Sequence, residues 1–428
     1  MTQTTRVLLA LLLGAAIGLG LSWFDPAHAA TAAGVVQPIG RLWLNALQMT
    51  VVPLVVALVV LGVNAASDAA ASGHTARNAI VVFLVLLTLA ASFAAVVAPA
   101  ALSLFPRDEL AVAAFRGALA PVSAGTGPAG FGDALAAIIP ANAIAAAAAS
   151  AMLPLVAFAL FVGFALGRID PVQRARLLGL AQAIADTMIV IVGWVLWAAP
   201  LGVFALVLAV CAQVGPQILG ALGGYILLLC AMYIAVTLLL YLVAAVFARE
   251  PVRRFALALL PAQAIAASTQ SSLASLPAMI DAARVRLGYP LRVSSMVLPM
   301  AVSLFRITSP VQYIGVAAFV AWLYGIELGP AQLAAGIGMA VIISMGSIGL
   351  PGQVSFMATN MPVTQAMGLP VEPLGVLLAV DTIPDAFATI GNVTADVAAT
   401  GVVARREPAD ADADDVVVVI VEPDEPRA

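Results

Sequence analysis

Lysine is missing from this sequence: all 18 basic residues among its 428 are arginines. The chain therefore has neither a Schiff-base lysine nor a P-loop lysine, which excludes the enzymes that depend on them. Charged residues make up only 9% of the chain and hydrophobic residues 63%, with a mean hydropathy of +1.10. This composition excludes an ordinary soluble domain and predicts a polytopic membrane protein.

Cysteine and histidine are also scarce, with two of each. Cys211 and Cys230 lie in apolar runs, so we expect small hydrophobic residues there and neither a disulfide framework nor a metal site. His28 and His74 are too far apart in the sequence to suggest a histidine metal site. The arginines are scattered over predicted loops and form no nucleic-acid-binding footprint.

Apolar runs predict about eight membrane-spanning helices. The first follows Arg6 and, at about 18 residues, suffices for a span; we interpret it as a transmembrane helix, although the PAHAA sequence after it resembles a signal-peptidase site. Residues 106–132 carry Gly, Pro and charges and should lie outside the membrane. The other spans are predicted near residues 43–63, 79–104, 134–166 (broken by prolines), 177–210, 218–247, 296–324 and 379–403.

Two apolar segments have polar or glycine-rich centres that argue against a simple span. Residues 255–283 contain ASTQSSLASLP, and residues 333–367 contain SMGSIGLPG. Each is better explained as a re-entrant hairpin of two half-helices, and paired interruptions of this kind indicate a transporter's binding site. The predicted fold class is an all-α integral membrane protein with about eight transmembrane helices and two re-entrant helical hairpins.

The distribution of arginine predicts the orientation of the chain in the membrane. If the N-terminus lies inside, Arg41, Arg107 and Arg116 are the loop arginines that fall outside, and the other loop arginines fall on the cytoplasmic side. Both termini are then cytoplasmic, and the protein is expected in the inner (plasma) membrane. Residues 405–428 form an acidic tail that we expect to be mostly disordered.

The last predicted helix carries four polar groups that share one narrow stripe. At about 100° per residue, and relative to Asp381, Asp385 lies near 40°, Asn392 near 20° and Asp396 near 60°. An ionised Asp at the bilayer centre costs at least about 2.5 kcal/mol, so these groups need a cation, a substrate or water. The alternative is a buried structural network, or an Asp381 that simply sits at the membrane interface.

Several motifs in a fixed order point to one family. The chain resembles the dicarboxylate/amino acid:cation symporter family, which includes the glutamate transporters, over about residues 5–406. The motifs are MTVVPLV at 49–55, IIPAN at 138–142, MLP at 152–154, APLGVFAL at 199–206, SSLASLP at 271–277, VLP at 297–299, SIGLPG at 347–352 and D-x-x-x-D…N-V-T-x-D in the last helix.

The resemblance implies a homotrimer in which a rigid scaffold holds a mobile transport domain that moves like an elevator. Applied to this chain, residues 1–254 supply mainly scaffold and trimerisation helices, with the third and parts of the sixth bordering the mobile unit. Residues 255–404 form the transport core of both hairpins and the last two spans. The expected partners are a small-molecule substrate, membrane lipids and further copies of the chain, with no nucleic acid.

The resemblance also implies roles for individual residues. Asp385 resembles the carboxylate that binds a substrate's α-amino group, and Asn392 the asparagine that binds its α-carboxylate. Asp396 resembles a sodium ligand, together with backbone oxygen from Asn392. The remaining residues expected at the substrate site are Ser271, Ser272, Arg306, Ser309, Leu350 and Gly352. A second sodium site is implied near Ser344, Met345 and Ser347.

The chain departs from the family pattern at two places. Members that carry acidic substrates have an Arg three residues after the Asp385 position, and here that residue is Ala388; Gln270 stands where other relatives place an Arg instead. The family's NMDGT motif is FRITS at 305–309, so Phe305 and Ile307 replace residues that supply side-chain oxygens to one sodium site. We expect that site to be absent.

Arg306 lies in the middle of an apolar span, where a lone guanidinium is costly. Three hypotheses follow. It pairs with Asp396 or Asp385 and stands in for a lost sodium, or it clamps a substrate carboxylate in compensation for Ala388, or it snorkels and pairs structurally.

The sequence predicts a secondary active symporter, not an enzyme, that moves a small amino acid or carboxylate. The combination of Asp385 with Ala388 favours a neutral amino acid, coupled to Na⁺ or H⁺ and without other cofactors. The first alternative is a C4-dicarboxylate or acidic amino acid symporter that uses Arg306 as its clamp. The others are a non-concentrating receptor or a channel-like family member; an intramembrane aspartyl protease lacks a second aspartate on another span.

Overall fold

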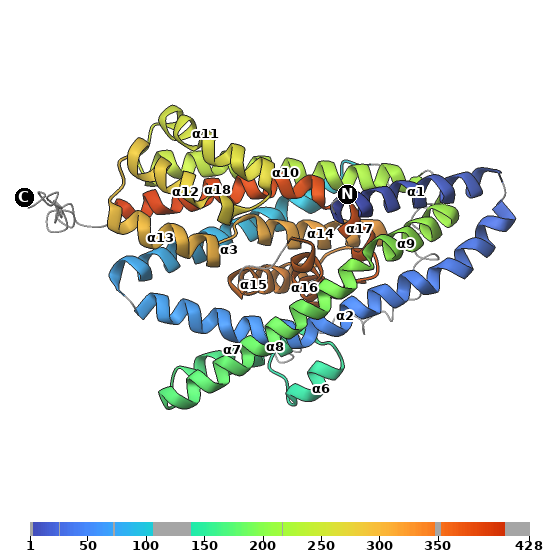
Figure 1. The fold of residues 1–428 in the computed structure, drawn as a ribbon, viewed down its shortest axis with the longest axis horizontal. Coiled ribbons are helices and arrows are strands. Elements are labelled where there is room, and N and C mark those ends of the chain that lie inside the picture. Colours follow the sequence, from blue (N-terminus) through green and yellow to red (C-terminus); the bar gives the residue numbers. More distant parts are fainter. Residues whose placement is uncertain are drawn as a thin grey trace, which may run out of the picture.

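The computed structural model describes residues 3–24, 26–71, 73–105, 138–215, 217–346 and 352–406. Apart from short turns, these residues are helical (Figure 1). Seven helical stretches in this described part are long and apolar enough to cross a membrane. The all-α membrane fold predicted from composition is therefore confirmed.

The N-terminal half builds a long framework. It consists of α1 (Gln3–Phe24), α2 (Pro26–Ala71), α3 (His74–Leu102), α6 (Ala143–Ala148), α7 (Met152–Leu166), α8 (Pro171–Trp197), α9 (Ala199–Val214) and α10 (Gln217–Phe247). Helix α2 runs for 46 residues, so it begins well before the predicted span at residue 43. The predicted fifth span divides into α8 and α9 at Ala198, just before Pro200, because proline cannot donate the helical hydrogen bond.

The C-terminal half contains both hairpins and the last helices. It consists of α11 (Val252–Thr269), α12 (Ser272–Asp281), a π-helical turn η1 (Ala282–Arg286), α13 (Leu291–Leu304), α14 (Thr308–Tyr324), α15 (Pro330–Gly346), α16 (Gly352–Ala366), α17 (Leu374–Val380) and α18 (Thr382–Ala404). Helices α11 and α12 form the first predicted hairpin. Helices α15 and α16 match the arms of the second, whose centre lies outside the described residues.

Two predicted continuous helices are broken in the structure. The span predicted over 296–324 lies within one apolar stretch long enough to cross the membrane, Leu291–Tyr324, but it is not one continuous helix, because α13 ends at Leu304 and α14 begins at Thr308. Phe305 between them is extended, with φ −124° and ψ 91°. The last helix is likewise interrupted at Asp381, three residues before Pro384. Both breaks leave backbone groups without helical partners beside the predicted site.

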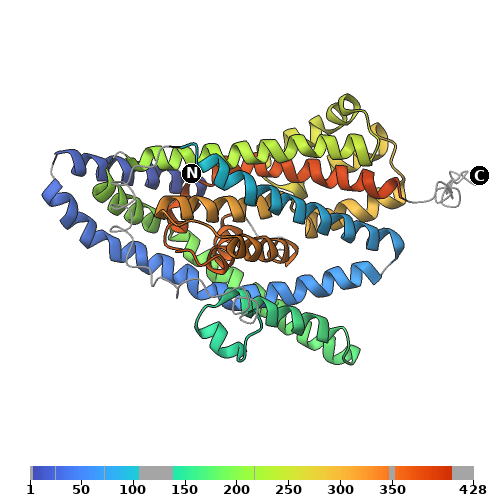
Figure 2. The same cartoon turned by 180° about the vertical axis from the view of Figure 1, so that it is seen from behind.

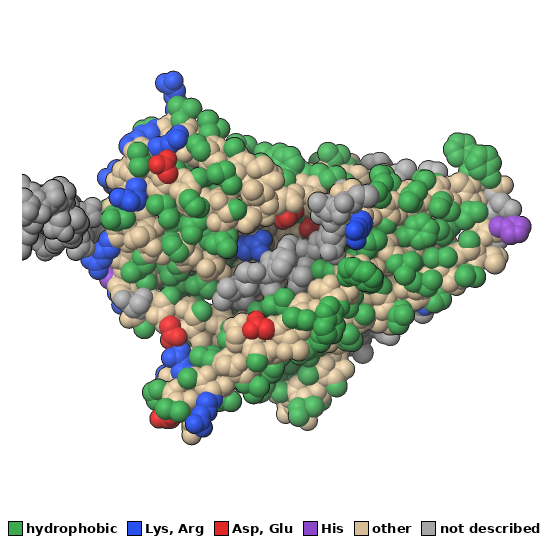
Figure 3. All heavy atoms as spheres, in the orientation of Figure 1, with side chains coloured by type: hydrophobic (Ala, Val, Ile, Leu, Met, Phe, Trp, Pro, Cys, Tyr) green, Lys and Arg blue, Asp and Glu red, His purple; other side chains and the backbone are tan. Residues whose placement is uncertain are grey.

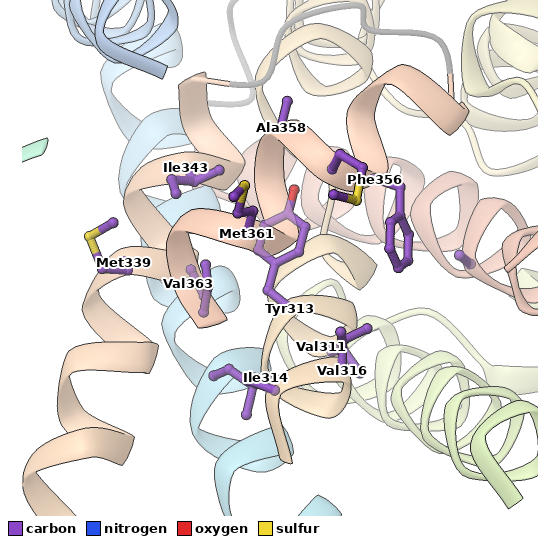
Figure 4. Close-up of a cluster of buried hydrophobic side chains, with 14 of the residues drawn as sticks. Val311, Tyr313, Ile314, Val316, Met339, Ile343, Phe356, Ala358, Met361 and Val363 are labelled. Carbon is purple, nitrogen blue, oxygen red and sulfur yellow. The ribbon is translucent and has the colours of Figure 1, made fainter. Parts of the chain in front are cut away.

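The elements separate into neighbouring groups (Figures 1 and 2). Helices α1, α2 and α9 pack together on one side, with α7 and α8 against α2, while α18 lies among α10, α11, α13 and α3. Between them, α14, α15 and α16 share a buried apolar cluster in which Tyr313, Ile343 and Met361 face one another (Figure 4). Helix α18 is thus enclosed by other helices, which is how its polar stripe becomes buried.

Candidate functional site

The polar stripe of α18 is buried along its length. Asp381 is 8% exposed, Asn392 2% and Asp396 0%. Asp385 is half-buried and lies one turn after Asp381, whose carbonyl oxygen accepts its backbone N–H at 3.0 Å. The carboxylate of Asp381 is therefore enclosed by protein.

Asp381 is held by two side chains that the sequence did not single out. Nε2 of Gln312, on α14, lies 3.0 Å from both carboxylate oxygens, and the Tyr225 hydroxyl, on α10, donates to Oδ1 at 3.3 Å. These bonds give a buried carboxylate the donors that it needs. Asp381 is therefore occupied by structural partners, and the adjacent Asp385 is not.

Asn392 is fixed in one orientation by Thr308 at the start of α14. The backbone N–H of Thr308 donates to Oδ1 of Asn392 at 3.0 Å, and its hydroxyl donates to the same oxygen at 2.9 Å. Since both bonds end on Oδ1, the Nδ2 group is the part of the amide left to donate to a carboxylate. The helices also approach closely here: a Cβ on Gly391 would lie 2.7 Å from Cγ2 of Thr308.

The tip of the first hairpin lies against the start of α18. Gln270 has a left-handed backbone, with φ 51°, and its Nε2 donates to the Thr382 carbonyl at 3.0 Å. Ser271 caps α12 by accepting the backbone N–H of Ala274 at 3.2 Å. Ser272 is the first residue of α12 and, like Ser271, is half-buried. The tip therefore brings serine hydroxyls and the N-terminal N–H groups of α12 next to the helix that carries Asp385.

The other predicted residues fall on the surrounding elements. Ser309 is buried at the start of α14, and its backbone N–H donates to the Arg306 carbonyl at 3.0 Å. Ser344 and Met345 are buried near the end of α15, with the Ser344 hydroxyl bonded to the Ala340 carbonyl at 2.7 Å. Gly352 is the first residue of α16. Ser347 and Leu350 lie outside the described residues.

The helix break at residues 305–307 places Arg306 at the centre of this arrangement. Its half-buried side chain lies within electrostatic reach of both Asp385 and Asp396. Within the described part of the chain, neither carboxylate forms a hydrogen bond or an ion pair with it. A hollow in the middle of one face has basic and acidic side chains at its floor (Figure 3).

This arrangement combines two interrupted helices, a serine hairpin tip and three carboxylates on one stripe. A model of the sodium:dicarboxylate symporter family matches residues 4–406. The chain belongs to this family. The family resemblance seen in the sequence is thereby confirmed.

Relatives similar to this chain are named for different substrates. The chain is 28% identical to the proton/glutamate-aspartate symporter of Escherichia coli, over 94% of this chain and 92% of that protein. It is 29% identical to the neutral amino acid transporter B(0) of Oryctolagus cuniculus, over 92% and 78% respectively. It is 26% identical to the proton/sodium-glutamate symport protein of Bacillus caldotenax, over 94% of each chain.

The surroundings of Phe305 are aromatic and apolar. The Phe305 ring stacks on the Phe83 ring of α3, with centroids 4.6 Å apart and planes 6° apart. Both rings are fully buried, and Ile307 is buried beside them in the same core. The FRITS sequence signalled a change at this position, but the aromatic partner on α3 was not predicted, because nothing in the sequence links Phe83 to Phe305.

Proposed function

We propose that this protein is a secondary symporter that moves a small neutral amino acid across the membrane together with a cation, H⁺ or Na⁺. The observation that carries the proposal is that Asp385 and Asn392 lie on the same stripe of α18 and both have side-chain groups available to a ligand. Asp385 has a half-buried carboxylate with no hydrogen-bond partner among the described residues, and Asn392 keeps its Nδ2 donor free of Thr308. An amino acid presents the complementary groups, an ammonium and a carboxylate.

Ala388 supports a neutral side chain on the substrate. It is buried on the same helix, one turn after Asp385, and its carbonyl lies 3.3 Å from the Thr308 hydroxyl. No guanidinium projects from this position to hold a second, distal carboxylate. In this respect we place the chain nearer to its neutral amino acid transporter relatives than to the glutamate-aspartate symporter.

The serine tip of the first hairpin completes the proposed substrate site. Ser271, Ser272 and the backbone N–H groups at the start of α12 are donors suited to the substrate carboxylate. Ser309, Leu350 and Gly352 are proposed to line the same site. Asp396 and the carbonyl of Asn392, with Ser344, Met345 and Ser347, are the groups from which a coupling-ion site would be drawn.

We further propose an elevator mechanism in a homotrimer. Residues 255–404 would move as the transport core, and residues 1–254 would supply mainly the scaffold. This division is supported by the packing of α18 against α11 and α13 within the C-terminal half, and of α1 against α9 within the N-terminal half. Helices α3 and α10 also contact α18, which makes them the border of the mobile unit.

Both termini are proposed to be cytoplasmic, in the inner (plasma) membrane. Basic side chains gather over α11 to α13, at the end from which α18 leads to the C-terminus (Figure 3). Arg249, Arg253, Arg254, Arg286, Arg405 and Arg406 line two cavities there. The positive-inside rule assigns this end to the cytoplasm. The protein is not proposed to catalyse a reaction.

A second candidate substrate class is a C4-dicarboxylate or an acidic amino acid. It is favoured by one observation: Arg306 lies within electrostatic reach of Asp385. From the break between α13 and α14, its guanidinium would bind the distal carboxylate with the bidentate geometry that arginine offers. In this case Arg306 replaces the arginine missing at Ala388.

Uptake into proteoliposomes tests these functions. Labelled L-alanine, L-serine, L-aspartate and succinate are supplied in turn, with H⁺ and Na⁺ gradients imposed separately. Concentrative uptake of L-alanine or L-serine supports the proposal. Uptake of succinate or L-aspartate that is lost in Arg306→Met supports the second candidate. If no solute is concentrated under either gradient, the symporter proposal fails and a receptor or channel-like activity takes its place.

A further inference from the structure

Asp396 is the most isolated charged side chain of the stripe. It is 0% exposed, and neither carboxylate oxygen has a hydrogen-bond partner within the described part of the chain. The backbone carbonyl of Asp396 accepts the Thr400 hydroxyl at 2.7 Å. Burying an ionised carboxylate without a partner is too costly to be stable, so Asp396 either is protonated or has a positive charge nearby.

The side chains at the break beside the stripe fit a bound sodium ion poorly. A sodium site in a broken-helix transporter is built from several oxygen atoms, drawn from carboxylates and unwound carbonyls. Here Phe305 and Ile307 supply none from their side chains, and the Phe305 ring is stacked on the Phe83 ring. The hydroxyl of Thr308, at the end of the break, already donates to Asn392 at 2.9 Å.

Arg306 supplies the charge that this pocket lacks. It projects from the non-helical residues between α13 and α14, where the chain is free of helical constraints. Thr308, two residues after Arg306, is bonded to Asn392, which lies one turn before Asp396 on α18, so the break that carries Arg306 lies beside this part of the stripe. An arginine stays protonated at every physiological pH, so its positive charge is permanent.

We infer that the Arg306 guanidinium is a tethered cation that balances Asp396 in place of a bound sodium ion, so that transport by this protein does not need Na⁺. The inference rests on the proposed function and deepens it by assigning the coupling. A free sodium ion enters and leaves with each cycle and so links uptake to its gradient. A charge fixed to the chain cannot do so, which leaves H⁺, of the two cations in the proposed function, as the coupling ion.

The position of Arg306 also connects the two ends of the stripe. In the proposed scheme, before substrate binds, the single positive charge of Arg306 partly balances two carboxylates, Asp385 and Asp396. When a substrate ammonium group pairs with Asp385, it repels the guanidinium and releases it to Asp396. Substrate binding thus completes the neutralisation of the buried carboxylate, which is the role that a coupling ion would otherwise perform.

A charge-removal cycle tests the inference on the full-length protein in proteoliposomes. Wild type, Arg306→Met, Asp396→Asn and the double variant are compared for labelled L-serine uptake under a proton gradient, with Na⁺ either present or replaced by choline. Wild-type uptake is expected to change by less than about twofold when Na⁺ is removed. Arg306→Met should lose about tenfold or more, because Asp396 is left unbalanced, and Asp396→Asn should restore much of it.

Arg306→Lys and Arg292→Met are the matched controls. The lysine variant keeps the positive charge and should retain sodium-independent uptake at a reduced rate. Arg292 is exposed at the start of α13, so its removal should leave uptake unchanged. The inference is overturned if wild-type uptake requires Na⁺, or if the losses in Arg306→Met and Asp396→Asn simply add in the double variant.

Thermal unfolding of the same four proteins in detergent provides a readout that does not depend on transport. Arg306→Met should lower Tm, and adding Asp396→Asn should recover part of that loss. If L-serine and the other solutes are not transported at all, the proposed function fails while the Tm cycle still decides the charge pairing. Additive changes in Tm would overturn the inference. If Arg306→Met cannot be purified, Arg306→Lys, which keeps the positive charge, is compared with Asp396→Asn, which removes the negative one. A larger loss of Tm in Asp396→Asn supports the charge pairing of Arg306 with Asp396, and no loss of Tm in either variant contradicts it.

Discussion

The backbone N–H and the hydroxyl of Thr308 both donate to Oδ1 of Asn392, at 3.0 and 2.9 Å. This pair of bonds joins the start of α14 to the middle of α18. It holds the Asn392 amide with its Nδ2 donor directed away from Thr308. The helix break at residues 305–307 makes this contact possible. In a continuous helix the Thr308 amide would be bonded to a backbone carbonyl of its own helix and could not reach Asn392.

Replacing Thr308 by Val should weaken substrate binding by loosening Asn392. The lost hydroxyl bond is worth about 1 kcal/mol, which corresponds to a KM raised about fivefold. The measurement is labelled L-serine uptake over a range of concentrations. Thr400→Val is the matched control, because that buried hydroxyl bonds only the Asp396 carbonyl of its own helix. Equal changes in the two variants would contradict an orienting role for Thr308.

Asp385→Asn should remove the ion pair with the substrate ammonium group. A hydrogen bond between charged groups contributes about 1.5–3 kcal/mol, so KM should rise by about 10- to 100-fold. Asp186→Asn provides the comparison, since Asp186 is an exposed carboxylate on α8. If Asp385→Asn instead transports a dicarboxylate at the wild-type rate, the result supports the second candidate, in which Arg306 binds a substrate carboxylate.

Phe305→Ala should destabilise the protein through the loss of the buried stack with Phe83. Truncating a fully buried phenylalanine costs about 3–5 kcal/mol, from lost burial and the cavity that is left. Thermal unfolding in detergent should show a clearly lowered Tm. Phe161→Ala is the control, because this side chain on α7 is 61% exposed. Similar Tm values for the two variants would show that the Phe305–Phe83 stack contributes little.

Glu250, in the turn between α10 and α11, should make stability depend on pH. Burial raises the pKa of its carboxyl group, and Arg254 and Arg405 only partly oppose this effect. Because the folded pKa lies above the unfolded one, the protonated form is favoured in the folded state. The contribution of Glu250 is thus most favourable below its ordinary pKa of about 4.5 and is lost as pH rises through the raised value.

The Glu250 prediction is checked by measuring Tm from pH 4 to 8 for wild type and Glu250→Gln. The difference between the two should grow in favour of the Gln variant as pH rises. Asp281→Asn is the control, since Asp281 is an exposed carboxylate that also contacts an arginine, Arg286, at 3.4 Å. A Glu250→Gln difference that is constant with pH would mean that the interactions with Arg254 and Arg405 cancel the effect of burial on the pKa of Glu250, and a difference that shrinks as pH rises would mean that they outweigh it.

The class of the molecule and the place of its site follow from local patterns in the sequence. Hydropathy predicts membrane helices, and the polar or glycine-rich centres at 267–277 and 344–352 predict breaks in two of them. Because unpaired backbone is not tolerated in lipid, these breaks must lie within the protein, beside a site. The helical repeat alone is enough to align Asp385, Asn392 and Asp396 on one face of the last helix. Each of these properties can be read from a short stretch of chain.

Which of these groups are satisfied depends on the tertiary structure. The Asp381 carboxylate accepts hydrogen bonds from Gln312 and Tyr225, whereas the Asp396 carboxylate in the same stripe has no hydrogen-bond partner among the described residues. The stack of Phe305 on Phe83 and the break that carries Arg306 likewise depend on contacts between distant segments. Helical periodicity shows which side chains share a face, but the neighbours that supply donors, charges or bulk to that face come from other helices, and only their packing determines them.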